Sequence, residues 1–474
     1  MSRSLAISNA AACYDNGTFL KRLKRSVALR TESEAETNLP ELYRYLEHFL
    51  TPLVEALGFS VKIHDNPVAG RGPFMIATRI ECAGLPTVLT YGHGDVVRGY
   101  DEQWAEGRSP WDVTVDGERW YGRGTADNKG QHLINLTALE QTLKARNGTL
   151  GFNVKLLLEM GEEAGSPGLS AFCASHKDAL AADVFIASDG PRLTAERPTV
   201  FLGSRGVFNF ELVVNLREGA HHSGNWGGLL ANPGVILANA ISSMIDQHGR
   251  VKVAGLMPES VPAPVRQALA DIQLGAGPDD PAIDDHWGEP GLSRSEKVFA
   301  WNTLDIIAFK TGNSDNPVHA IPGRASAHCH IRFVVDSDFN TFIPAVRAHL
   351  DAHGFGSVEI KQSPNEVMQA TRLDPNSPWV DWALTSLAQT TGKQVALLPN
   401  LGGSLPNDVF AQVLGLPTLW VPHSYPACSQ HAPNEHLLSP LVREGLHIMA
   451  GLFWDLGNDA SRLMREHAAA VKTL

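Results

Sequence analysis

The sequence predicts an α/β fold in which a mostly parallel sheet forms the main domain and an α+β domain is inserted into it. Over the first two hundred residues, apolar strand-like runs alternate with helix-like stretches, a pattern typical of a parallel sheet covered on both faces. Near residue 204 the pattern changes to alternating polar and apolar residues, as expected for antiparallel strands with one solvated face. The first pattern resumes near residue 377.

The strands expected in the main domain are short apolar runs, and most of them are followed directly by a polar cluster. They are Val88–Tyr91, Val154–Leu158, Val184–Ala187 and Thr418–Val421. A helix is expected from about Lys129 to Arg146, where leucines recur at helical spacing, and others near Trp379–Thr391 and from Pro440 to about Leu456. Open α/β sheets bind ligands at the carboxyl ends of their strands, so the polar clusters are candidates for one shared site.

The middle of the chain is predicted to form a separate α+β domain. Its expected elements are two alternating strands, one helix and a long stretch of weak periodicity: Phe208–Val214, Ala325–Phe333, Pro233–Gln247 and Met257–Pro290. The predicted domains are therefore a discontinuous main domain, residues 1–203 and 377–474, and an insert, residues 204–376.

Length and composition limit the classes of protein to consider. A chain of 474 residues exceeds what one hydrophobic core usually supports, so two domains are expected. The net charge of −12 disfavours nucleic acid and anionic membranes as partners. Five separated cysteines without a CxxC pair argue against disulfides and thiolate metal sites, and they indicate a reducing, cytoplasmic location.

Five separated segments each carry a side chain of a type that binds metal ions. These residues are His93, Asp127, Glu163, Asp189 and His431. Three carboxylates and two imidazoles suit two zinc ions that share one bridging carboxylate and keep a position open for water. The same ligands also suit Mn²⁺ or Co²⁺. The pattern predicts metal-assisted hydrolysis.

Each segment taken alone also has an ordinary structural explanation. His93 and Asp95 fit a surface turn, Asp189 fits a helix cap, and the adjacent Glu162 and Glu163 fit a solvated helix start. Two neighbouring carboxylates repel one another unless a cation or a proton relieves them, which favours metal binding. In that interpretation Glu163 binds metal, Glu162 faces the attacking water as general base, and Asp95 orients the imidazole of His93.

Other catalytic motifs are absent or incomplete in the sequence. The loop Gly122–Gly124 lacks the third glycine of a dinucleotide-binding pattern, and no GxSxG, HExxH or Walker motif occurs. The loop His221–Gly224 places an imidazole among glycines, where a polar donor is unusual without a role.

Six motifs together carry a resemblance to a known family. They are GHGDVV at 92–97, YGRGTADNKG at 121–130, EMGEEAGSPGL at 159–169, SDG at 188–190, HHSGNWGG at 221–228 and GGSLPND at 402–408. The chain resembles the co-catalytic zinc peptidases, which include carnosinase, cytosolic non-specific dipeptidase, aminoacylase, acetylornithine deacetylase and glutamate carboxypeptidase. The resemblance runs from about Leu89 to His436 and is closest to the carnosinase-like dipeptidase branch.

The resemblance implies two zinc ions per subunit. His93 and Asp189 would hold one ion. Glu163 and His431 would hold the other, and Asp127 would bridge the two.

The resemblance also implies roles outside the metal centre. Arg332 would bind the substrate carboxylate, and Ser404 would lie at the substrate backbone. His222 would reach across a dimer interface to stabilise the oxyanion in the neighbouring active site. This chain has His319 where family members often carry Asn or Thr, so we expect a different substrate contact there.

The function expected from the sequence is hydrolysis of the amide bond of dipeptides or short peptides that have a free C-terminal carboxylate. A bridging hydroxide, activated by Glu162, would be the nucleophile. A homodimer formed through the inserted lid and dimerisation domain is expected. Two alternatives remain open: an N-acyl-amino-acid amidohydrolase with the same dinuclear site, and a non-catalytic binding protein on this scaffold.

Overall fold

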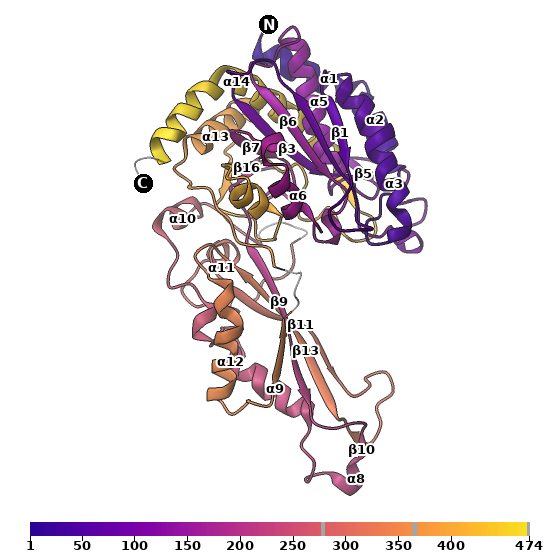
Figure 1. Ribbon diagram of the computed structural model, residues 1–474, viewed down its shortest axis with the longest axis vertical. Coiled ribbons are helices and arrows are strands. Elements are labelled where there is room, and N and C mark those ends of the chain that lie inside the picture. The colour runs from indigo at the N-terminus through magenta and orange to yellow at the C-terminus, as the bar shows by residue number, and fades with distance from the viewer. Residues whose placement is uncertain (276–279, 363–366, 472–474) are drawn as a thin grey trace.

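The computed structural model describes residues 1–275, 280–362 and 367–471. The chain forms two parts that are stacked along the long axis of the molecule (Figure 1). One part contains both termini and a large sheet. The other is elongated and contains a smaller sheet with helices along one side.

The large sheet has eight strands. In spatial order they are β1 (Ser60–His64), β2 (Phe74–Arg79), β6 (Asn153–Glu159), β3 (Thr87–His93), β7 (Val184–Ala187), β16 (Thr418–Trp420), β8 (Thr199–Phe201) and β15 (Ala396–Leu398). Neighbours from β6 to β16 pair in parallel, as do β8 and β15, whereas β1, β2 and the β16–β8 junction are antiparallel. The predicted mostly parallel sheet is confirmed.

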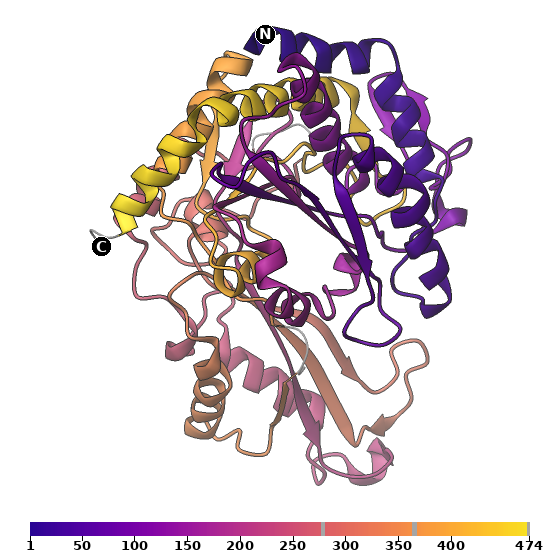
Figure 2. The ribbon, with the colours of Figure 1, turned by 45° about the horizontal axis from the view of Figure 1, so that its top comes forward.

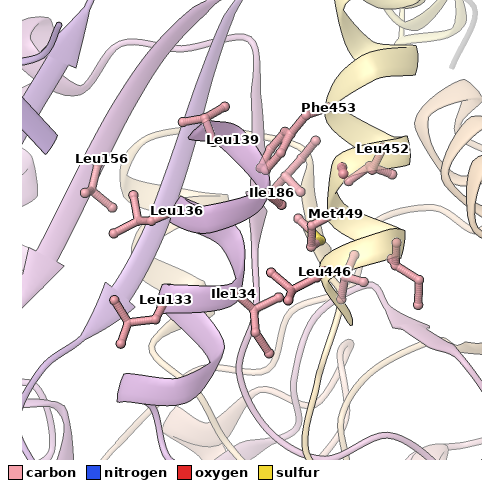
Figure 3. Close-up of a cluster of buried hydrophobic side chains, with 14 of the residues drawn as sticks. Leu133, Ile134, Leu136, Leu139, Leu156, Ile186, Leu446, Met449, Leu452 and Phe453 are labelled. Carbon is pink, nitrogen blue, oxygen red and sulfur yellow. The ribbon is translucent and has the colours of Figure 1, made fainter. Parts of the chain in front are cut away.

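Helices cover one face of this sheet. They include α1 (Arg3–Asp15), α2 (Thr18–Val27), α5 (Lys129–Ala145), α13 (Pro378–Thr391) and α14 (Ser439–Val471). The first and last helices of the chain lie side by side on this face (Figure 2). Ile134 of α5 lies beside Leu446 of α14, whereas Leu133 and Leu136 of α5 point to the other side, toward Leu156 of the sheet (Figure 3). Side chains alternate along a strand, so every second residue of a strand points into this core. Val88 of β3 and Val154 of β6 are examples.

The last helix is longer than the sequence predicted. We expected it to end near Leu456, but α14 continues to Val471. Ala460 and Leu463 remain buried on the same helix face, so the apolar pattern continues beyond the expected end.

The opposite face of the sheet has its own core. Leu89, Tyr91 and Phe185 point into it, together with α6 (Leu169–Ser175) and the π-helical segment Val409–Val413. A further contributor was not foreseen. The stretch of weak periodicity in the predicted insert contains α10 (Ala263–Ala268), and Val261, Val265 and Leu269 pack into this core.

The smaller sheet is antiparallel and has the order β11 (Thr303–Thr311), β13 (Arg324–Phe333), β9 (Gly206–Asn215) and β14 (Glu359–Gln362). The helices α9 (Pro233–Met244) and α12 (Phe342–Ala352) pack on one face. The alternating strands that the sequence predicted are β9 and β13, and their burial alternates accordingly. The helix α9 ends three residues before the expected Gln247. The domain boundaries 203/204 and 376/377 stay a prediction.

Short elements complete the described chain. The helices are α3 (Leu39–Arg44), the π-helix Tyr45–Leu50, α4 (Thr51–Glu55), α7 (Lys177–Leu180), α8 (Ser223–Trp226) and α11 (Arg294–Phe299), with 3₁₀ turns at Glu36–Asn38, Asp101–Gln103, Glu162–Ala164, Ala254–Leu256 and Phe339–Thr341. The strands β4 (Thr114–Asp116), β5 (Arg119–Tyr121) and β17 (His436–Leu438) form a three-stranded sheet, and β10 (His221–His222) pairs with β12 (Ala320–Ile321). Within the described ranges, no helix is both long and apolar enough to cross a membrane.

Candidate metal centre

The topology of the large sheet brings the predicted ligands to one edge. His93 is the last residue of β3. Glu163 and Asp189 lie just beyond the ends of β6 and β7, which are the two neighbours of β3. Asp127 precedes α5, and His431 lies in the loop between β16 and β17. Since parallel strands end on the same side of a sheet, segments remote in sequence converge here.

Asp127 lies between the two imidazoles. Its Oδ1 is 3.0 Å from Nε2 of His93, and its Oδ2 is 2.9 Å from Nε2 of His431. Glu163 approaches the same His431 nitrogen at 3.0 Å, and Asp189 lies 3.6 Å from Nε2 of His93. The ligand atoms of His93, Asp127 and Glu163 all lie within 4.8 Å of one another. The two carboxylate oxygens of Asp127 therefore face two different sides of one cluster.

The donors fit divalent cations of the zinc type. All are imidazole nitrogens or carboxylate oxygens, as Zn²⁺, Mn²⁺ and Co²⁺ accept. The Oδ2 atom of Asp189 is buried and has no hydrogen-bond partner among the described residues, a costly state that a cation would relieve. His93 is fully buried, whereas the side chain of His431 is 54% exposed, so the cluster is closed on the sheet side and accessible beside His431.

The pKa values reflect an excess of negative charge in a buried place. Burial, together with the charge of Asp127, raises the pKa of Glu163 to about 7 and that of Asp189 to about 6. Hydrogen bonds to Asp127 and Glu163 raise the pKa of His431 to about 11. Burial opposes the charged form of His93, but its hydrogen bonds to acidic side chains outweigh that effect and raise its pKa well above the ordinary value. The raised pKa values of the imidazoles favour protonated forms, which offset the same negative charge that a bound metal ion would offset.

Asp95 links the imidazole of His93 to the turn that carries the two glutamates. Its carboxylate is buried, with Oδ1 3.5 Å from Nδ1 of His93. The same carboxylate accepts hydrogen bonds from the backbone N–H groups of Glu162 and Glu163, each at 3.1 Å. The backbone carbonyl of Asp95 lies closer still to Nδ1 of His93, at 3.2 Å, so Asp95 orients the predicted ligand on β3 and its carboxylate fixes the turn beyond β6.

Glu162 stands at the rim of the cluster. Its Oε2 lies 3.9 Å from Nε2 of His93. Burial raises the pKa of Glu162 well above the usual value, and the charges of Glu163 and Asp189 add to this effect against the opposing charge of His93. A carboxyl group with a raised pKa, next to the predicted metal ligands, is suited to accept and return a proton.

Arg332 and Ser404 are in contact where the two parts of the molecule meet. A guanidinium N–H of Arg332 donates to Oγ of Ser404 at 2.5 Å, and that hydroxyl donates to the carbonyl of Arg205 at 2.6 Å. Arg332 is half-buried and makes no ion pair with any carboxylate of the described chain. Its bidentate donor face remains available for an acidic group.

His222 and His319 do not reach the metal ligands within one subunit. Both lie at the far tip of the elongated part, where β10 pairs with β12 (Figure 1). The carbonyl of His319 accepts a hydrogen bond from the N–H of Ser223 at 2.8 Å, and both imidazoles are exposed. These two residues neighbour each other and lie far from His93.

Three polar residues at this site were not assigned a role from the sequence. Gln430 donates a hydrogen bond to Oδ2 of Asp127, and the side chain of Asn128 donates to the carbonyl of Ser188 at 2.9 Å. Asn128 follows the predicted ligand Asp127 and Gln430 precedes the predicted ligand His431, so adjacency was an available signal. The third, Glu435, gave no signal because a single acid in a loop is unremarkable by sequence.

A cavity of about 580 Å³ lies apart from this cluster. The segment 282–301 and the start of β11 form most of its wall, and Arg205 and Asp305 also line it. None of the predicted metal ligands is among its described lining residues.

Comparison with known families identifies the kind of protein. Residues 89–455 match the model of peptidase family M20/M25/M40. The chain belongs to this family. The predicted family resemblance and the prediction of a metal-dependent peptidase are thereby confirmed.

Several curated M20-family relatives have the name of a dipeptidase. The Beta-Ala-His dipeptidase of Homo sapiens is 35% identical over 78% of this chain and 75% of its own length. The enzyme of the same name from Mus musculus is 27% identical over 94% of each chain. The Cysteinylglycine-S-conjugate dipeptidase of Corynebacterium striatum is 26% identical over 77% of this chain and 79% of its own.

Solved structures share the whole fold. The Saccharomyces cerevisiae di-peptidase Dug1p superposes with a TM-score of 0.79 at 21% identity, over 97% of this chain and 99% of its own. Human carnosine dipeptidase 1 gives 0.77 at 22% identity, over 95% and 99%. The predicted α/β fold with a second domain is confirmed.

Binding of a divalent cation such as Zn²⁺ is expected to release protons and to tighten as the pH rises. Imidazoles and carboxylates bind metals in their deprotonated forms. Acidic neighbours raise the pKa of His93 and of His431, and burial raises that of Glu163 to about 7, so all three groups hold protons more strongly in the metal-free protein. The cation therefore competes with protons. Calorimetric titration with Zn²⁺ in two buffers of different ionisation enthalpy measures the release.

The absence of this dependence on pH would contradict the prediction. An affinity for Zn²⁺ that stays constant between about pH 6 and about pH 8, with no proton uptake by the buffer, would exclude these imidazoles as ligands.

Proposed function

We propose that this M20-family enzyme hydrolyses dipeptides or short peptides with a free C-terminal carboxylate, using two Zn²⁺ ions per subunit. The observation that carries the proposal is the position of Asp127, whose two oxygens each face a different imidazole at about hydrogen-bond distance. That arrangement suits a carboxylate shared by two ions. The dipeptidase names of the relatives support this substrate class.

The proposed ligand sets follow from the distances. One ion would take His93 and Asp189, the other Glu163 and His431, and Asp127 would serve both. Bound there, two divalent cations would supply a nucleophile from water and polarise the scissile carbonyl. Mn²⁺ or Co²⁺ would be accepted by the same donors.

Glu162 is the proposed general base. Its carboxylate takes the proton of the attacking water and delivers it to the leaving amine. Its raised pKa makes it a stronger base than an ordinary carboxylate, which favours uptake of the proton. Asp95 keeps the backbone of Glu162 in place through the hydrogen bond at 3.1 Å.

Arg332 is the proposed anchor for the C-terminal carboxylate of the substrate. It is a half-buried guanidinium without an acidic partner in the described chain, and Ser404 already orients one of its N–H groups. A bidentate pair with a carboxylate would select peptides with a free C-terminus. Ser404 would also lie near the substrate backbone.

A homodimer formed through the elongated part would complete the site. Its edge strand β11 exposes Ile307 by 64% and Phe309 by 45%, and α9 exposes Val235 by 58%. Exposed apolar side chains on an unpaired strand edge favour cover by another protein surface, and a second copy is the proposed occupant. In that dimer His222 of the partner subunit would stabilise the oxyanion, with His319 beside it.

The cytoplasm is the proposed location. All five cysteines are unpaired, and four of them are buried, which suits a reducing compartment. The net charge of −12 disfavours binding to nucleic acid or to anionic membranes.

The substitution Glu162→Gln tests the proposed base. The amide cannot accept the proton, so kcat for a dipeptide is expected to fall about 10²–10⁴-fold while both metal ions remain bound. The matched variant His431→Ala removes a ligand and is expected to lose metal as well as activity. Metal content by mass spectrometry and kcat by amine release are measured on both variants.

Two outcomes would count against the proposal. Near wild-type hydrolysis by a metal-loaded Glu162→Gln enzyme would refute its role as the base. Faster hydrolysis of N-acyl amino acids than of dipeptides by the wild-type enzyme would favour the amidohydrolase instead.

Mixing Glu162→Gln subunits with His222→Ala subunits tests the shared site. A mixed dimer has one site with an intact Glu162 and an intact His222 from the other chain. Activity is expected to recover to about a quarter of the wild-type value, because half of randomly exchanged dimers are mixed and each has one complete site. The control pairs Glu162→Gln with the double variant, which leaves no complete site. Absence of recovery after verified exchange would show that His222 does not act across chains.

A further inference from the structure

Glu435 is a buried carboxylate whose four hydrogen bonds all come from the loop that carries Asp127. Its Oε1 accepts from the backbone N–H groups of Ala126, at 2.9 Å, and Asp127, at 3.1 Å. Its Oε2 accepts from the backbone N–H of Gly124, at 3.1 Å, and from Nη1 of Arg123, at 2.8 Å. The side chains of Glu435 and Arg123 are each 1% exposed.

The backbone of Glu435 ties the same loop to a second one. Its carbonyl accepts a hydrogen bond from the N–H of Gly122 at 3.0 Å, and the next residue, His436, donates to the carbonyl of Cys428 at 2.9 Å. The loop closed by this contact contains His431, which adopts a left-handed backbone conformation with φ of 61°. Because the side chain of His431 is 54% exposed, its position depends on the base of this loop more than on packing.

The contacts require a charged group at position 435. All four partners are donors, so both oxygens of the side chain must accept. A neutral glutamine would turn its own N–H₂ toward two of these donors and leave them unsatisfied in a buried place. A carboxylate accepts from all four, and the guanidinium of Arg123 offsets its buried charge.

We propose that Glu435 is a positioning residue that fixes the separation of Asp127 and His431, and thereby sets the affinity for the metal ion that these two side chains share. The inference rests on the proposed metal ligands, and no atom of Glu435 touches the metal or the substrate in it. Nε2 of His431 and Oδ2 of Asp127 lie 2.9 Å apart, and Glu435 is joined by hydrogen bonds to the loop of Asp127 and lies at the base of the loop of His431.

The variant Glu435→Gln tests the proposal through metal affinity instead of activity. The metal-free protein is titrated with Zn²⁺ against a competing chelator. We expect one of the two ions to bind about 10–100-fold more weakly than in the wild type, and the ion assigned to His93 and Asp189 to change less. Excess Zn²⁺ is expected to restore kcat, because the catalytic groups are unchanged.

The matched control is Glu296→Gln. Glu296 is also a buried glutamate, 8% exposed, but it caps α11 through Ser293 and contacts no residue of the metal centre. Its Zn²⁺ affinity is expected to equal the wild-type value. If Glu435→Gln does not fold, Glu435→Asp replaces it, since the shorter side chain keeps the charge but reaches fewer of the four donors.

The outcomes separate this inference from the proposed function. Wild-type affinity for both ions in either Glu435 variant, or an equal loss of affinity in Glu296→Gln, would overturn the positioning role. A wild-type protein that binds fewer than two ions would instead overturn the dinuclear site, whatever Glu435 does.

Discussion

Repulsion among buried carboxylates governs the architecture of the metal centre. Asp127, Glu163 and Asp189 converge within a few ångströms of two imidazoles, on the side of the cluster that the sheet closes off from solvent. Such a group is unfavourable unless positive charge neutralises it. Without a metal ion, the acidic neighbours raise the pKa of His93 and His431 and so favour their positively charged forms. The site is therefore built for cations, and the surrounding hydrogen bonds keep the acidic groups together against their mutual repulsion.

The sheet makes this convergence possible. β3 lies between β6 and β7. The strand order alone therefore places His93 next to the turn of Glu163 and next to Asp189. The other two predicted ligands lie in loops, so their positions depend on contacts with other segments. Asp95 supports the glutamate turn, and Glu435 joins the loop of Asp127 to the loop that carries His431. Three of the predicted ligands thus lie at or just beyond the ends of neighbouring strands, and the other two lie in loops.

Much of this could be predicted from sequence because the signals are local. The apolar runs of β3, β6 and β7 are unambiguous, and each precedes a polar cluster, so three of the candidate ligands could be named before their geometry was known. The strand β1 was missed because it is a short edge strand with only two apolar residues, Val61 and Ile63. The packing of Val265 and Leu269 into the core of the large sheet was missed because it joins segments that are distant in sequence.

The residues that could not be assigned act through contacts distant in sequence. Glu435 reaches Asp127 across more than three hundred residues, and no periodicity marks it. The position of His222, at the far tip of the elongated part, follows from the tertiary arrangement of the smaller sheet and not from its own motif. The predicted metal ligands thus gather within one chain, whereas the proposed oxyanion donor would have to come from a second copy.

Crystals of the zinc-loaded enzyme, measured on both sides of the zinc absorption edge, would locate the ions directly. Two anomalous peaks are expected, one on each side of the carboxylate of Asp127, with His93 and Asp189 at the first and Glu163 and His431 at the second. A single peak, or peaks that Asp127 does not touch, would contradict a dinuclear centre bridged by this residue.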